Sequence, residues 1–179
     1  MLTRADAWTN MVRLTAAGFA AAVGGADAIV LAPFTEPLGP PTSFARRQAR
    51  NAQLVLMEEA HLGRVEDPAG GAGYIESVTD ALAREAWALF QRVEGAGGLA
   101  RALEGGQVAA VVARAREALV ADFREGRRKL LGVTDFRSAD DTPPETAAET
   151  PRKAGPDVRL PGPDTTCPPL TPWRFEEAL

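Results

Sequence analysis

Residues 27–32, with the sequence Asp-Ala-Ile-Val-Leu-Ala, constrain the fold more than any other segment. The segment is short, apolar after Asp27 and closed by Pro33. A continuous rather than alternating apolar run is typical of a strand that is buried on both faces of a parallel sheet. We therefore predict a buried strand here, and no second segment of the sequence predicts one convincingly. Such a strand needs parallel neighbours on both sides.

The hydrophobic pattern before and after this segment is helical. Apolar side chains recur at three-to-four spacing over residues 6–23, which predicts an amphipathic helix that ends at Gly24-Gly25. A second helix is predicted to begin at a Thr42 or Ser43 cap and to end at about His61.

Three further helices are predicted downstream. Ser77 with Asp80 resembles a capping box, and the helix that follows should carry a core stripe. Glycines at 95–98 end this helix, and shorter helices are predicted over residues 99–104 and about 107–127. The predicted core stripe comprises Leu82, Ala86, Phe90 and Val93.

After Arg137 the composition changes. Residues 138–179 hold nine of the fourteen prolines and show no periodicity, so we expect a linker or an extended tail. One strand among helices, in a chain shorter than the roughly 250 residues of a (β/α)8 barrel, predicts an α/β fold: the C-terminal segment of such a TIM barrel, mostly helical as it stands. The predicted domains are residues 1–137 and the Pro-rich tail, 138–179.

Composition excludes several classes of protein. The formal net charge of -4 gives no basic surface for nucleic acid and no polybasic segment for a membrane. The single Cys167 rules out an intrachain disulfide framework and fits a reducing compartment. No apolar run reaches the length of a membrane span, and the first residues lack the pattern of a signal peptide. We therefore expect the protein in the cytoplasm.

Four blocks of sequence resemble one family. They are Asp6-Ala7-Trp8-Thr9-Asn10-Met11-Val12-Arg13; Leu38-Gly39-Pro40-Pro41-Thr42-Ser43-Phe44; the stretch from Arg50-Asn51-Ala52-Gln53 through His61 to Gly71; and Leu131-Gly132-Val133-Thr134-Asp135-Phe136. In order and spacing, these blocks resemble segments of the adenosylcobalamin-dependent methylmalonyl-CoA mutases, and the similarity covers roughly residues 3–137.

The resemblance implies a specific chemistry for the whole enzyme. In that family a (β/α)8 barrel binds the CoA ester, and a flavodoxin-like domain supplies a histidine to cobalt from a D-x-H-x-x-G motif. The enzymes are isomerases that interconvert methylmalonyl-CoA and succinyl-CoA, and the cofactor carries the radical chemistry. Many bacterial members pair a catalytic large subunit with a small, non-catalytic one.

Two departures imply the small subunit. Catalytic chains carry a polar string of His, Gln, Ser and His where this chain has Gly25, Asp27, Ala28 and Val30. Side chains without hydrogen-bonding groups cannot hold a CoA ester or a corrin amide in the same way. The only histidine is His61 and no D-x-H-x-x-G occurs, so we predict no catalytic, cofactor-binding or metal-binding residue in this chain.

Several residues have a functional interpretation that we weigh against a structural one. His61 suits the negative end of a helix better than a ligand role, and Glu58 and Glu59 do not share a face. The loop 67–73 lacks the Lys-Ser/Thr of a phosphate loop. We interpret the remaining candidates as surface, core or interface positions: Arg46, Arg47 and Arg50; Arg127, Arg128 and Lys129; Trp8, Trp87 and Phe90; and Cys167.

The sequence thus predicts part of the small subunit of a methylmalonyl-CoA mutase. We expect it to be structural, to bind no adenosylcobalamin itself, to pair with the catalytic large subunit and to meet acyl-CoA only through the holoenzyme. Two alternatives stay open. The chain is a fragment of an active acyl-CoA mutase with another substrate, or it is a truncated, free-standing helical interaction protein.

Overall fold

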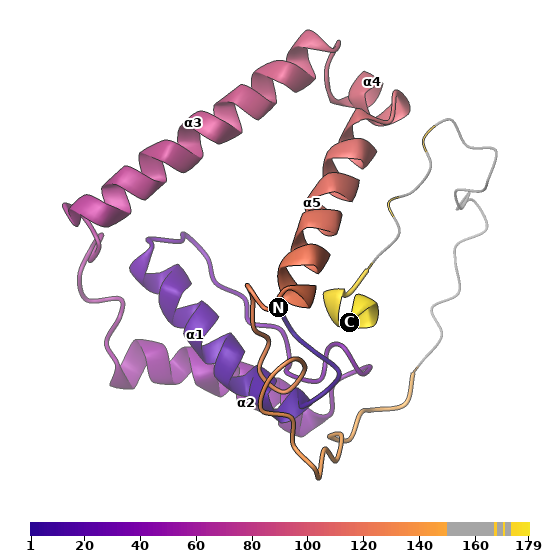
Figure 1. The fold of residues 1–179 in the computed structure, drawn as a ribbon. Coiled ribbons are helices and arrows are strands. Elements are labelled where there is room, and N and C mark those ends of the chain that lie inside the picture. Colours follow the sequence, from indigo (N-terminus) through magenta and orange to yellow (C-terminus); the bar gives the residue numbers. More distant parts are fainter. Residues whose placement is uncertain (150–166, 168–169, 171–172) are drawn as a thin grey trace, which may run out of the picture. The chain divides into compact units, whose positions relative to one another are not determined.

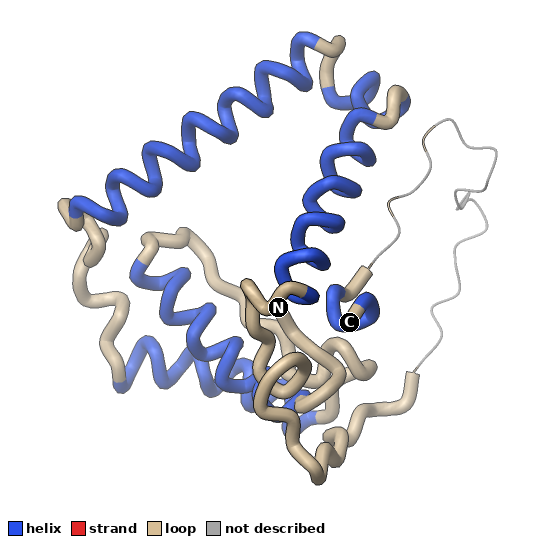
Figure 2. Tube along the Cα trace, viewed as in Figure 1, coloured by secondary structure: helices blue, strands red, loops and turns tan. Residues whose placement is uncertain are grey.

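The computed structural model describes residues 1–149, 167, 170 and 173–179. Every regular element of this described part is a helix (Figures 1 and 2), so the prediction of a mostly helical chain is confirmed. The chain divides into two compact units, which are described separately below. One unit is Met1–Gly70 with Lys129–Pro151, and the other is Gly71–Arg128 with Arg152–Leu179. Most of the predicted Pro-rich tail lies outside the described residues.

The predicted strand does not form within the described part of the chain. Residues 28–32 pair with no described residue, and within the described part a single isolated β-bridge joins Leu131 with Asp135. The physical reason is that a strand is defined by backbone hydrogen bonds to a neighbour, and the described chain supplies no neighbouring strand. The segment is apolar, as a buried strand would be, but it forms no row of backbone hydrogen bonds with a neighbouring strand.

The first unit is built on two helices. A short 3-10 turn, η1 (Ala7–Thr9), leads into α1 (Asn10–Val23), which ends at Gly24 as predicted. The predicted start at residue 6 is too early, because Asp6 has a left-handed backbone, with φ of 46°. In α2 (Ser43–Leu54), the Thr42 hydroxyl accepts a hydrogen bond from the Ala45 amide at 3.3 Å, which confirms the predicted cap.

The core of this unit lies between α1, α2 and the loop after residue 32. Phe34 is 2% exposed and packs with Leu14 and Ala45. Its ring lies 5.3 Å from that of Trp8 and 6.2 Å from that of Phe44, edge-on to the latter. Burying one aromatic ring among two others is worth about 2–3 kcal/mol or more, which makes Phe34 the anchor of the unit.

The second unit contains α3 (Gly73–Gly95), α4 (Leu99–Glu104), α5 (Gln107–Arg124) and a terminal turn, η3 (Phe175–Ala178). The predicted range of α4 and the end of α3 are confirmed. The predicted Ser77–Asp80 capping box is wrong, because α3 begins at Gly73 and both residues lie inside it. Asp80 instead forms an ion pair with Arg84 at 2.8 Å, one turn along the helix.

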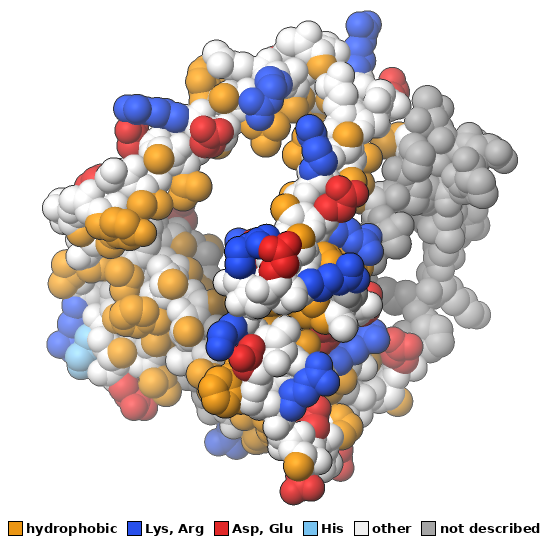
Figure 3. All heavy atoms as spheres, viewed as in Figure 1, with side chains coloured by type: hydrophobic (Ala, Val, Ile, Leu, Met, Phe, Trp, Pro, Cys, Tyr) orange, Lys and Arg blue, Asp and Glu red, His pale blue; other side chains and the backbone are white. Residues whose placement is uncertain are grey.

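The predicted core stripe of α3 is also wrong in this structure. Leu82 is 65% exposed and Phe90 51% exposed, and α3 has no buried residue. The reason is that a stripe is buried only when another element covers it, whereas α3 packs chiefly on the short α4. Hydrophobic side chains along this helix are visible at the surface in Figure 3.

Candidate functional site

Residues 28–32 form an apolar segment without backbone partners, which we call the open segment. Its side chains alternate sharply in burial: Val30 is 91% exposed, whereas Leu31 is 9% exposed. Leu31 lies over Gly18 of α1, where an added methyl group would come within 3.2 Å of its Cδ1 atom. No described residue forms a backbone hydrogen bond with the open segment. Its peptide groups are therefore available to another strand.

Two hollows border the open segment. One has a volume of about 380 Å3 and lies between the segment and the Leu14–Ala21 side of α1, with Met1 and Leu2 at its edge. The other, of about 290 Å3, is lined by Gly18, Asp27, Gln53, Leu56 and Leu62, among others. Apolar side chains dominate both linings, so these hollows suit packed side chains better than a polar ligand.

A buried polar network fixes the end of the open segment to α1. Asn10 is fully buried, and its Nδ2 donates to the carbonyl oxygens of Thr3 (2.8 Å) and Phe34 (3.0 Å). Its Oδ1 accepts from the Thr3 amide at 3.1 Å and from Arg13 Nη1 at 2.8 Å. Every hydrogen-bonding group of the Asn10 amide is satisfied, so the network specifies one arrangement of the N-terminus, α1 and the Phe34 loop.

Sequence reasoning missed this network. The signal that could have found it is Asn10 beside Arg13 on a helix face that otherwise carries apolar residues such as Leu14. Thr3 and Phe34 come from outside the helix, so their part depends on the tertiary fold.

The segment from Leu131 to Ala147 lies along the surface of the same unit and is held there by hydrogen bonds. Arg13 Nη2 donates to the Leu131 carbonyl at 2.5 Å, and the Trp8 indole Nε1 donates to the Thr142 carbonyl at 2.9 Å. The Asp6 amide donates to Asp141 at 2.9 Å, and the Ala147 amide donates to the Pro40 carbonyl at 2.8 Å. All four sequence blocks that carry the family resemblance lie in this unit, apart from Gly71, and these hydrogen bonds connect three of the blocks.

The single histidine lies at a helix end, as predicted. The π-helical turn η2 (Val55–Glu59) continues α2, and His61 follows it with a left-handed backbone, φ of 56°. Its side chain is exposed, as are those of Glu58 and Glu59. The structure therefore assigns His61 to the close of a helix. No cluster of three or more His, Cys, Asp or Glu that could hold a metal ion occurs among the described residues.

Three of the remaining candidate segments lie at the surface: the arginines of α2, Cys167 and the glycine-rich loop. Arg46, Arg47 and Arg50 are exposed, and Arg46 donates to the Pro41 carbonyl at 2.7 Å. The exposed Cys167 is a free thiol, and the glycine-rich loop 67–73 is largely exposed.

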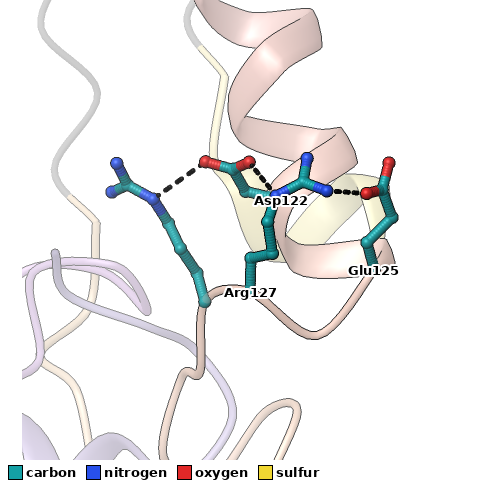
Figure 4. Close-up of polar contacts among 4 residues, drawn as sticks. Asp122, Glu125 and Arg127 are labelled. Atoms are coloured by element: carbon teal, nitrogen blue, oxygen red, sulfur yellow. Dashed lines mark hydrogen bonds and ion pairs between the residues drawn. The ribbon is translucent and has the colours of Figure 1, made fainter.

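Acidic groups after α5 organise the other basic cluster. Figure 4 shows Arg127 between Asp122 and Glu125, and Arg127 Nε lies 2.8 Å from Asp122 Oδ1. Arg128 reaches the second Asp122 oxygen at 3.2 Å. The hydrogen bond from Arg127 is the main cause that lowers the pKa of Asp122; desolvation opposes it, and the charge of Arg127 and the contact with Arg128 lower the pKa further. Arg127, Arg128 and Lys129 are exposed, as predicted, and the two arginines pair with carboxylates just after α5 ends at Arg124.

A second carboxylate has a lowered pKa. The Thr134 hydroxyl, which lies 2.8 Å from the Asp135 carboxylate, is the main cause that lowers the Asp135 pKa, and Lys129 at 3.2 Å lowers it further. Both carboxylates pair with groups in the turns after α5, and neither is among the residues that line the two hollows. None of the helices in the described part is long and apolar enough to cross a membrane.

Comparison with known proteins agrees with this geometry. The methylmalonyl-CoA mutase family model matches residues 1–156. The chain is 44% identical over 165 residues to the methylmalonyl-CoA mutase small subunit of Streptomyces virginiae, covering 90% of this chain and 26% of that relative. It is 40% identical over 136 residues to the small subunit of Propionibacterium freudenreichii subsp. shermanii, covering 75% of this chain and 21% of that relative.

A third relative is not named as a small subunit. The methylmalonyl-CoA mutase of Escherichia coli is 39% identical over 138 residues, covering 76% of this chain and 19% of that relative. The chain thus spans about a quarter, or less, of the length of these curated relatives. It belongs to the methylmalonyl-CoA mutase family and is similar to the small subunits of that family.

Proposed function

We propose that the chain is a structural part of the small subunit of an adenosylcobalamin-dependent methylmalonyl-CoA mutase. In this proposal residues 1–137 belong to the C-terminal part of its (β/α)8-barrel domain, and residues 138–179 are a linker toward a cobalamin-type domain. The observation that carries the proposal is the open segment. It is apolar, its peptide groups are unpaired, and Val30 is 91% exposed. A barrel strand whose neighbouring strands are not present would have these properties.

The residues of this chain do not fit the cofactor or the CoA ester. At the positions of the family's polar string, only Asp27 carries a polar side chain, while Gly25, Ala28 and Val30 offer none. His61 closes a helix at the surface and borders neither hollow of the open segment. Adenosylcobalamin supplies the radical chemistry where it is bound in this family. We assign no step of the isomerisation to residues of this chain.

The proposed partner is the catalytic large subunit, as the names of the small-subunit relatives suggest. The chain would then meet an acyl-CoA substrate only through the holoenzyme. Its exposed apolar side chains, including those of α3, support a role in assembly, because isolated proteins rarely expose such extended apolar faces.

Strand complementation tests the barrel assignment. The chain is co-expressed with the barrel segment that precedes the matched region in the S. virginiae small subunit, and amide hydrogen exchange is followed in residues 28–32. We expect the two to copurify and these amides to become protected when strands pair beside them. A Val30→Asp variant should lose both effects, whereas Val65→Asp, at a position 62% exposed in a loop, should keep them. Free exchange of residues 28–32 in a stable complex would contradict the assignment.

Cobalamin binding tests the non-catalytic assignment. The pure chain is mixed with adenosylcobalamin, passed over a desalting column and assayed for cobalt. We expect no cobalt in the protein fraction. Retention of one cobalt per chain would contradict the assignment and favour a fragment of an active mutase.

A further inference from the structure

The second unit holds a contact between distant parts of the chain that the proposed function does not use. The guanidinium carbon of Arg116, in α5, lies 4.4 Å from the centre of the Trp173 ring, which is the geometry of a cation–π interaction. Residues 173–179, which we call the docking segment, include the turn η3, and η3 contacts α5 (Figure 1). Both elements belong to the same compact unit.

One face of α5 is shaped to receive this segment. At 100° per residue, Ala113, Arg116 and Val120 lie within about 60° of one another around the helix. These residues border a hollow of about 980 Å3, and Leu170 and Trp173 border it from the other side. A small alanine opposite a large indole lets two facing surfaces interdigitate. The hollow is therefore a seat in which a bulky ring can lie against α5.

The contact is partial, so the docking segment is held loosely. Trp173 and Arg174 are half-buried, whereas Ala113 and Arg116 are exposed, and α5 has no fully buried residue. A weak contact is nevertheless populated when both surfaces belong to one chain, because tethering gives an effective concentration up to the order of millimolar. The occupant that this favours is the docking segment of the same chain rather than a separate molecule.

The charges on the two sides can be paired. Two arginines and two glutamates line the hollow on the α5 side, and the docking segment carries one arginine and two glutamates. Arg124 is the last residue of α5, and Glu176 and Glu177 lie in the first turn of η3. A guanidinium group is planar and weakly hydrated, so it stacks well on an aromatic face, and Trp173 supplies that face to Arg116. The α5 face thus suits an aromatic residue followed by acidic ones.

We propose that this face of α5 is an intramolecular docking site for residues 173–179, with Trp173 on Arg116 as its anchor, and that the segment docks reversibly. Docking closes the chain between α5 and Trp173 into a loop. The proposed function treats residues 138–179 as a linker, and the docking site adds a point at which the end of that linker is held. The proposal rests on contacts within one unit and does not require that the chain serve a mutase subunit.

Fluorine NMR of the full 179-residue chain, labelled with 5-fluorotryptophan, tests the docking. A Trp173→Phe variant assigns the Trp173 signal, and an equally labelled peptide of residues 170–179 gives the chemical shift of the undocked ring. We expect the Trp173 signal of the chain to differ from that of the peptide, and the difference to be the same at every chain concentration. Coincidence of the two signals would overturn the proposal. A difference that disappears on dilution would assign the contact to a second copy and would overturn it as well.

A matched pair of alanine variants tests which face of α5 receives the segment. Ala113→Glu places a carboxylate in the hollow one turn before Arg116, where it competes with the indole for the guanidinium group. It should move the Trp173 signal most of the way to that of the free peptide. Ala118→Glu is the control, because residue 118 is exposed and lies about 140° from residue 113 around the same helix, and it should leave the signal in place. Equal shifts in the two variants would contradict the assignment of this face.

A pair of arginine variants tests the anchor without adding a charge to the hollow. Arg116→Gln removes the cation under the Trp173 ring and should also move its signal toward that of the peptide. Arg114→Gln removes an exposed cation about 160° away around the helix and should not. A Trp173 signal that responds equally to both substitutions would overturn the role of Arg116.

Discussion

Asn10 donates a hydrogen bond to the carbonyl oxygen of Phe34 at 3.0 Å, and both residues are almost fully buried. This contact joins the first residue of α1 to the loop that follows the open segment. The contact thereby fixes the position of the open segment relative to α1, which itself packs in the core around Phe34.

Replacement of Asn10 by Leu should lower the free energy of unfolding by about 2–3 kcal/mol. The substitution leaves the Thr3 amide, the Phe34 carbonyl and one Arg13 contact without their buried partner, which costs more than the hydrogen bonds themselves contribute. Urea unfolding measures the change. Thr15→Ala is the control on the same helix, since the exposed Thr15 hydroxyl donates to the Met11 carbonyl one turn back, and it should change stability by less than about 0.5 kcal/mol. Equal effects of the two variants would contradict the role of the network.

Gly132→Ala should destabilise the first unit more than Gly25→Ala. Both glycines have positive φ, 75° and 74°, so each alanine introduces backbone strain of about 1 kcal/mol. At Gly132 the added methyl group would also lie 2.4 Å from Asp6 Cβ, whereas at Gly25 it meets nothing within 4 Å. Displacing Asp6 should add about 1–3 kcal/mol. Thermal unfolding of the two variants measures the difference, and equal losses would show that this close approach is relaxed in solution.

His61→Gly should stabilise the protein by up to about 1 kcal/mol. The backbone of residue 61 is left-handed, with φ of 56°, and glycine adopts this conformation without the steric cost of a Cβ atom. His61→Ala keeps that cost and serves as the comparison. A loss of stability in both variants would mean that the imidazole ring itself stabilises the helix end, as a favourable charge interaction would.

Acid titration should show that the Asp122 pKa lies below its ordinary value of 3.8, because the hydrogen bond from Arg127 favours the charged form. A carboxylate with a lowered pKa in the folded protein contributes stability above its unfolded pKa and loses it as the pH falls through the folded pKa. The contribution should therefore begin to fall as the pH drops below about 4 and be lost once the pH has passed below the folded pKa. NMR titration of the Asp122 side chain measures the effect. The Arg127→Gln substitution should raise the Asp122 pKa, whereas Arg84→Gln should leave it unchanged, because Arg84 pairs with Asp80.

The sequence alone predicted the local features of this protein. The Thr42 cap located the start of α2, the glycines after Val23 and within 95–98 located the C-terminal ends of α1 and α3, and helix periodicity with these glycines gave the full range of α4, because these signals act within a few residues. The short motifs also identified the family, since they match in order and spacing.

Only the tertiary structure decided which apolar residues are covered. The open segment reads as a buried strand, yet pairing depends on neighbours that lie elsewhere in a fold. The α3 stripe reads as core, yet its burial depends on a second surface. The Asn10 network and the approach of Gly132 to Asp6 join residues far apart in the chain, and no local pattern encodes which distant groups will meet, because that is settled by the packing of the whole unit.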